Sequence, residues 1–125
     1  MTDKSILLVD DEEIVIGVGR QMLEKLGFAV LTATNGKEAL DVYKINQNYI
    51  DFVVLDMIMP ELSGAETYDR LKAINPEIKV LLSSGYSMNS QAEAILARGC
   101  KGFIQKPFNI EQISKKIREI LDHTP

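Results

Sequence analysis

The sequence predicts an α/β fold in which a five-stranded parallel sheet carries helices on both faces. Short runs of β-branched and other apolar residues alternate five times with amphipathic stretches of helical length, as in repeated βα units. The first and third runs are continuously apolar, as in strands buried on both faces. Because crossovers between parallel strands are right-handed, such units build a doubly wound sheet.

Two βα units are expected in the first part of the chain. Residues 6–9 form a strand, and the helix after it stops at Gly27 and repeats its apolar residues at helical spacing: Val15, Val18, Met22 and Leu26. Residues 28–33 form a weaker second strand. Asn35 is the N-cap of the next helix, with Glu38 three residues later.

The third unit begins with a strand at residues 52–55. Ser63 and Glu66 have capping-box spacing, and the helix they open ends before Pro76. Residues 78–82 form the fourth strand, and the helix after it is marked by Ala92, Ile95 and Leu96.

That helix stops near Gly99, and residues 101–104 form a short fifth strand. Asn109 and Gln112 cap a final helix whose apolar stripe consists of Ile110, Ile113, Ile117 and Ile120.

Length and composition predict one soluble domain over residues 1–125, with its core at about 4–121. The 125 residues are 46% hydrophobic and 26% charged, which is ordinary for a globular domain. A net charge of −4 argues against a nucleic-acid-binding surface, which needs clustered Lys and Arg. Cys100 is the only cysteine, which excludes a disulfide framework. No signal peptide or membrane-spanning run is apparent, so we expect a cytoplasmic protein without direct membrane contact.

Polar side chains follow four of the predicted strands. The positions are Asp10 and Asp11, Asp56, Ser83 and Ser84, and Lys106 before Pro107. The carboxyl ends of parallel strands meet at one edge of a sheet, where such folds place their functional groups. We therefore expect three carboxylates, a hydroxyl and an ammonium group to lie close together.

This combination of groups indicates phosphoryl-transfer chemistry. Crowded carboxylates repel one another and raise each other's pKa, and a hard divalent cation such as Mg²⁺ relieves that repulsion. The cation and Lys106 would neutralise an incoming phosphoryl group, and Ser84 would donate a hydrogen bond to it. Asp56 is the candidate nucleophile, since a carboxylate can form an acyl phosphate.

Each position also has an ordinary structural interpretation. Asp10 and Asp11 precede a helix and could cap it, and Asp56 could start a turn. Ser84 could be a loop residue and Lys106 a solvated surface lysine. No structural rule requires all of them at strand ends, so their joint placement favours the functional interpretation.

At these residues the sequence resembles the receiver domains of bacterial two-component signalling. The resemblance covers about residues 4–121 and rests on four segments in order: 8–12 (LVDDE), 53–60 (VVLDMIMP), 82–86 (LSSGY) and 102–108 (GFIQKPF). It implies a CheY-like, flavodoxin-like sheet with strand order 2-1-3-4-5.

The resemblance also implies a role for each site residue. Asp56 corresponds to the phosphorylated aspartate. Asp10 and Asp11 correspond to the acidic pair that binds Mg²⁺, with Asp11 preferred as the direct ligand, and the backbone carbonyl of Ile58 completes the metal site. The Ser84 hydroxyl turns toward the phosphoryl group.

Two more roles are implied for the switch itself. Lys106 pairs with the phosphoryl group, and Phe103 is the aromatic switch residue. Phe103 lacks the hydroxyl of the tyrosine that many receivers carry there.

Ile58 and Tyr86 match positions that flank the path of the hydrolytic water. Their bulk predicts a phosphoryl group that lasts many minutes, and loss within seconds in Mg²⁺ would contradict this.

The implied partner is a histidine kinase or histidine phosphotransfer protein, which supplies the phosphoryl group. Phosphorylation would reshape the face formed by the helix around Ala92, the strand at 101–104 and the final helix, and a homodimer could form through that face. The segments 82–87 and 106–109 resemble receivers attached to hybrid sensor kinases. The sequence leaves open whether the chain acts alone or belongs to a larger regulator.

Two other functions remain as alternatives. A small Mg²⁺-dependent phosphatase with an aspartyl nucleophile normally has a second Asp two residues on, where this chain has Ile58. A phosphorylation-independent interaction module would be expected to lose Asp56, Lys106 or the acidic pair. The chain is therefore interpreted as a stoichiometric phosphoacceptor and not as an enzyme.

A few further residues attract attention but are expected to have structural roles. His123 lies at the end of the final helix, where a cation suits the helix dipole. Cys100 is expected to be partly buried before the fifth strand. Three methionines are expected to fill gaps in the packing: Met57, Met59 and Met88.

Overall fold

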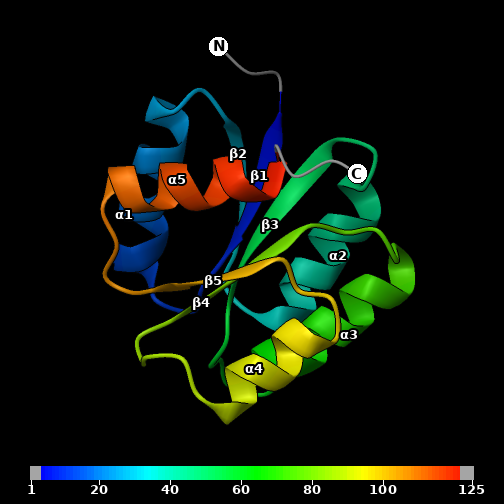
Figure 1. Ribbon diagram of the computed structural model, residues 1–125. Coiled ribbons are helices and arrows are strands. Elements are labelled where there is room, and N and C mark those ends of the chain that lie inside the picture. The colour runs from blue at the N-terminus through cyan, green and yellow to red at the C-terminus, as the bar shows by residue number, and fades with distance from the viewer. Residues whose placement is uncertain (1–3, 122–125) are drawn as a thin grey trace.

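The computed structural model describes residues 4–121 and shows five βα units in succession (Figure 1). The strands are β1 Ser5–Val9, β2 Ala29–Ala33, β3 Ile50–Asp56, β4 Val80–Ser84 and β5 Gly102–Gln105. The helices are α1 Glu13–Lys25, α2 Gly36–Asn46, α3 Gly64–Ile74, α4 Ser90–Ala97 and α5 Ile110–Leu121.

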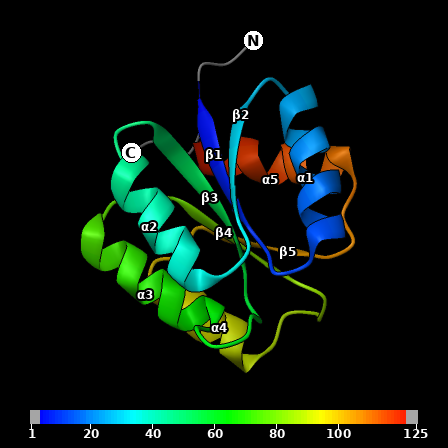
Figure 2. The same ribbon diagram turned by 180° about the vertical axis from the view of Figure 1, so that it is seen from behind.

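All five strands are parallel and lie in the order β2-β1-β3-β4-β5, which confirms the predicted fold class and strand order. Helices α1 and α5 cover one face of the sheet, and α2, α3 and α4 cover the other (Figures 1 and 2). From β1 the sheet grows to one side with β2 and to the other side with β3, β4 and β5, so functional groups at the carboxyl ends of β1 and β3 meet in one crevice.

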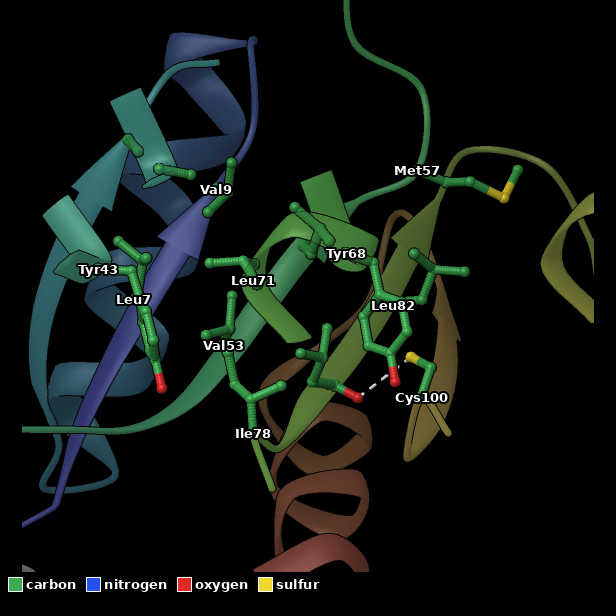
Figure 3. Packing of buried hydrophobic residues seen from close by; sticks show 14 of the residues in the cluster. Leu7, Val9, Tyr43, Val53, Met57, Tyr68, Leu71, Ile78, Leu82 and Cys100 are labelled. Carbon is green, nitrogen blue, oxygen red and sulfur yellow. Dashed lines mark hydrogen bonds between the residues drawn. The ribbon is translucent and has the colours of Figure 1, made fainter. Parts of the chain in front are cut away.

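The core has two layers because successive strand residues point to opposite faces of the sheet. Leu7 and Val53 pack under α2 and α3, where Tyr43 and Tyr68 are almost fully buried (Figure 3). On the other face, strand residues pack against Leu23 of α1 and three isoleucines of α5: Ile113, Ile117 and Ile120. Both central strands are buried on both faces, as their continuous apolar runs predicted.

The predicted helix caps are present. Asn35 accepts a hydrogen bond from the Glu38 amide at 2.7 Å, and Ser63 and Glu66 form the full capping box of α3. Asn109 and Gln112 exchange two backbone–side-chain hydrogen bonds of 2.8 Å at the start of α5. Helix α4 is also capped, by Asn89, which the sequence analysis did not identify.

Two details differ from the sequence-based expectation. Helix α1 buries Gly19 and Leu23, whereas Val18 is 48% exposed. The helix has apolar residues around much of its circumference, so periodicity alone did not fix which side faces the sheet. The fourth strand begins at Val80 and includes Ser83 and Ser84, because its register with β3 pairs Val53 with Val80.

Two glycines of α1 should respond in opposite ways to alanine. Gly17 is exposed and has open space around its Cα, so Gly17→Ala should stabilise the fold by about 0.5–1 kcal/mol through helix propensity. A Cβ at Gly19 would lie 3.0 Å from Leu8 Cδ2, so Gly19→Ala should destabilise it. Urea unfolding followed by circular dichroism measures both, and a stabilising Gly19→Ala would contradict this packing.

Candidate functional site

The carboxyl edge of the sheet brings together four charged side chains from three different strand ends. Asp10 and Asp11 follow β1, Asp56 is the last residue of β3, and Lys106 follows β5. The Asp10 amide still donates to Ala33 at 3.1 Å and the Lys106 amide to Ser84 at 2.7 Å, which extends the sheet hydrogen bonding to these residues. Hydrogen bonds of the sheet therefore fix the backbone positions of Asp10 and Lys106, from which their charged side chains extend.

Lys106 bridges the two buried carboxylates. Its Nζ lies 2.9 Å from Asp10 Oδ2 and 3.2 Å from Asp56 Oδ1. Asp10 and Asp56 are 1% and 3% exposed, and the lysine side chain is itself largely buried. The interpretation of Lys106 as a solvated surface lysine is therefore wrong.

Asp10 has both carboxylate oxygens engaged, since Oδ1 accepts the Glu12 amide at 2.9 Å while Oδ2 meets Lys106. The N-cap position of α1 is Glu12, so neither aspartate of the pair is the helix cap. Asp11 is exposed. One carboxylate oxygen each from Asp10, Asp11 and Asp56 lies within 4.8 Å of the others, close enough to hold one metal ion.

Burial dominates the electrostatics of Asp56. Desolvation, followed by repulsion from Asp10, raises the pKa of the Asp56 carboxyl from 3.8 to about 7, although Lys106 opposes the shift. From the sequence, mutual repulsion was expected to raise the pKa of the carboxylates. The repulsion contributes at Asp56, but removal from water is the larger cause.

Lys106 stays protonated at neutral pH. Burial alone would lower the pKa of its ammonium group, but the hydrogen bonds and charges of Asp10 and Asp56 outweigh that effect and raise it. The site therefore holds a fixed positive charge beside Asp56, suited to an incoming anion.

Ser84 is the last residue of β4, and Phe103 lies on the neighbouring strand β5. Ser84 is 1% exposed, and its Oγ accepts the Tyr86 amide at 3.1 Å. Phe103 pairs with Leu82 across β4 and β5 and packs, half-buried, against the core cluster under α2–α4. Ser83 lies directly opposite Asp56 in the sheet register.

The loop after β3 presents Ile58 at the site. Ile58 is 51% exposed, whereas its neighbours Met57 and Met59 are buried. Within residues 4–121, no backbone amide donates to the Ile58 carbonyl. This oxygen is therefore available as an additional ligand beside the three carboxylates.

An open cavity of about 770 Å³ leads to Asp56. Its lining includes three charged residues, Asp11, Asp56 and Lys106, together with Ile58 and Tyr86. One wall is apolar and comes from α1 and the segment after β5: Ile14, Val15, Val18, Met22, Pro107 and Phe108.

Val15, Val18 and Met22 were predicted only as apolar residues at helical spacing, which did not indicate that they line a cavity; Met22 also packs against the core. Ile14 is 82% exposed. The available signal was the excess of apolar residues in α1 over what one buried face needs.

The residues expected to have structural roles lie mostly where predicted. Cys100 is buried in the loop before β5, where its Sγ contacts the Val80 carbonyl at 3.3 Å. Met57 and Met59 are buried, as expected of gap-filling side chains, but Met88 is 43% exposed and that expectation is wrong. His123 lies outside the described residues.

In residues 4–121, every helix falls short of the length and apolarity required to cross a bilayer.

Comparison with known proteins matches this chain and its fold to one family. The family model of the response regulator receiver domain matches residues 6–118. The chain is 34% identical over 118 residues to the sensor kinase CckA of Brucella abortus (strain 2308), an alignment that covers 94% of this chain and 12% of that protein. The chain spans between 12% and 51% of the length of the curated relatives it matches.

Solved structures of receiver domains have the same fold as this chain. A response regulator receiver domain protein from Clostridium thermocellum superimposes with a TM-score of 0.90 at 31% identity, covering 95% of this chain and 94% of that one. A chain of the CheX–CheY–BeF3–Mg²⁺ complex from Borrelia burgdorferi gives a TM-score of 0.90 at 26% identity, covering 94% and 89%. The chain therefore belongs to the response regulator receiver domain family.

Proposed function

We propose that Asp56 accepts a phosphoryl group from a histidine kinase or a histidine phosphotransfer protein. The observation that carries this proposal is the cluster of Asp10, Asp11 and Asp56 within 4.8 Å, with Lys106 bridging two of them. Phosphorylation and Mg²⁺ binding are general properties of the family.

The chemistry is a displacement at phosphorus. An Asp56 carboxylate oxygen forms the new P–O bond while the P–N bond of the donor phosphohistidine breaks, and its electron pair returns to the imidazole. Lys106 neutralises charge on the transferred group. Because Lys106 already lies 3.2 Å from the acceptor oxygen, little reorganisation is needed to pair it with that group.

The donor set fits Mg²⁺. Three carboxylates and the Ile58 carbonyl are hard oxygen ligands, and the adjoining cavity leaves room for water or phosphate oxygens. We assign Asp11, Asp56 and Ile58 as direct ligands. Asp10, whose oxygens are already engaged, would act through water or by exchanging Lys106 for the ion. Bound Mg²⁺ supplies charge neutralisation for phosphoryl transfer.

Ser84 and Phe103 would carry the signal from the site. The Ser84 hydroxyl must leave the Tyr86 amide to reach the phosphoryl group, which frees the backbone between β4 and α4. Phe103 would then move inward behind the Ser84 hydroxyl, and this movement would reshape the face formed by α4, β5 and α5. Homodimerisation through that face stays a prediction, tested by sedimentation of the phosphorylated form.

The apolar wall of the cavity is the proposed docking surface for the donor. The cavity that includes Asp56 is lined by α1 and by the segment after β5, so a protein that brings a phosphohistidine to Asp56 through this cavity would contact both. Ile14 and Val18 present apolar side chains there that are 82% and 48% exposed. Burial of these groups would favour association.

This docking surface has a matched control. Ile14→Lys should slow phosphotransfer from a histidine kinase that phosphorylates the wild type by about tenfold or more, since a buried apolar contact is lost. Labelling by acetyl phosphate should not change. Ile45→Lys replaces an equally exposed isoleucine (80% against 82%) that does not line the cavity, and should affect neither rate. Equal transfer rates in both variants would reject the surface.

The proposed function itself is tested by labelling. Incubation with acetyl phosphate and Mg²⁺ should add one phosphoryl group per chain, with release of acetate, and peptide mapping should place it on Asp56. Continuous turnover of a phosphate ester would instead favour the phosphatase alternative. Labelling absent under all donors would favour an interaction module that works without phosphorylation.

The location of the domain in the cell, and whether it belongs to a larger protein, are inferred from the proposed function and the relatives. We infer a single receiver domain within residues 1–125, with its core at about 4–121, in the cytoplasm, where histidine kinases can supply the phosphoryl group, with no direct contact to nucleic acid. The similarity to part of the sensor kinase CckA supports a place within a hybrid kinase or phosphorelay. The reading frame around the gene decides between that arrangement and a stand-alone regulator.

A further inference from the structure

The loop that joins β3 to α3 is closed at Gly64. Gly64 is the first residue of α3, and its amide donates to the Met57 carbonyl at 2.9 Å. A Cβ placed on Gly64 would lie 2.5 Å from the Asp56 carbonyl oxygen and 2.6 Å from Met57 Cα. These are backbone atoms, so no side-chain rotation could relieve the contact.

The same loop is held at further points. The Met57 amide donates to Ser83 of β4 at 2.8 Å, and the Leu62 amide donates to the Pro60 carbonyl at 2.8 Å. The side chains of Met57 and Met59 are buried on either side of Ile58. The Ile58 peptide is therefore anchored from both directions, with its carbonyl left free of backbone donors.

We propose that Gly64 is a positioning residue for the metal site. Its missing side chain lets the start of α3 press directly on the main chain of Asp56 and Met57. This contact sets the place of the acceptor and of the Ile58 carbonyl before any ion binds. Metal affinity depends on such supporting groups because they hold the ligands in the binding geometry. The inference rests on the proposed function, since it assumes that Mg²⁺ binds at the acidic cluster.

Gly36 provides a matched control. It is the first residue of α2, directly follows an N-cap and is buried, as Gly64 is. The three nearest atoms that a Cβ there would meet are side-chain atoms, Thr67 Oγ1 and two carbons of Leu62, whereas at Gly64 they are backbone atoms of Asp56 and Met57. Alanine at Gly36 or Gly64 should therefore destabilise the fold, whereas only Gly64→Ala should reach the metal site.

The experiment is calorimetric titration of Mg²⁺ into metal-free protein. Gly64→Ala should weaken Mg²⁺ binding by about tenfold or more, and Gly36→Ala should change it by less than about twofold. Unchanged affinity in Gly64→Ala, or equal losses in both variants, would overturn the positioning role. Absence of Mg²⁺ binding by the wild type would overturn the metal site of the proposed function instead.

A measurement on the wild type keeps the inference testable if Gly64→Ala does not fold. In metal-free protein, the hydrogen of the Gly64 amide should exchange with solvent as slowly as those of the core amides of β3. The reason is that the hydrogen bond from this amide to the Met57 carbonyl should belong to the rigid part of the fold. Exchange orders of magnitude faster than β3 would show that the loop opens locally, and would overturn the positioning role.

Discussion

Asp56→Asn should reduce labelling by acetyl phosphate and Mg²⁺ from one phosphoryl group per chain to background. Asparagine has almost the same shape and can still accept a hydrogen bond from Lys106, so the surrounding packing is retained. It lacks the carboxylate nucleophile that forms the acyl phosphate. The loss should therefore come from chemistry and not from unfolding, which circular dichroism can verify.

The control is Asp41→Asn, which neutralises an exposed aspartate on α2 and should label as the wild type does. Labelling that survives in Asp56→Asn would reject Asp56 as the acceptor. Peptide mapping would then show whether Asp11, the exposed carboxylate of the same cluster, takes the phosphoryl group in its place.

The second large effect is on stability, where Asp56→Asn should stabilise the metal-free protein at alkaline pH. The folded pKa of Asp56 is about 7 against an ordinary 3.8, so the folded state binds this proton more tightly than the unfolded chain. The resulting stabilisation is complete below the unfolded pKa and is lost as the pH rises through the folded one. Asparagine carries no charge at any pH and removes this dependence.

The variant should therefore match the wild type near pH 4 and exceed it by roughly 2–4 kcal/mol above pH 7. Urea unfolding in EDTA, followed by circular dichroism because the chain has no tryptophan, measures the difference. Equal stabilities above pH 7 would show that the ionised Asp56 is not destabilising.

Excess Mg²⁺ should reduce this difference in stability between Asp56→Asn and the wild type. Ligands that bind only the folded state stabilise it by mass action, and the wild type offers one more negative oxygen ligand than the variant. Repeating the unfolding series with Mg²⁺ should raise wild-type stability more than that of Asp56→Asn. A difference that Mg²⁺ leaves unchanged would argue against Asp56 as a ligand.

Local sequence signals predicted the elements of this fold well. Asn35, Ser63 and Asn109 begin helices as predicted, because capping depends on residues within one turn. Errors occurred where a choice depended on distant residues. The buried side of α1 and the start of β4 are decided by what lies across the sheet.

The sequence by itself determined which groups stand at the carboxyl ends of the strands, because alternating βα units leave few topologies. The tertiary structure decided how they interact. Lys106 meets Asp10 and Asp56 from 96 and 50 residues away, and burial raises the pKa of Asp56. Gly64, which the sequence showed only as part of a helix start, rests on the acceptor backbone. Desolvation and steric contact arise only when distant segments pack together, so neither can be read from local sequence pattern.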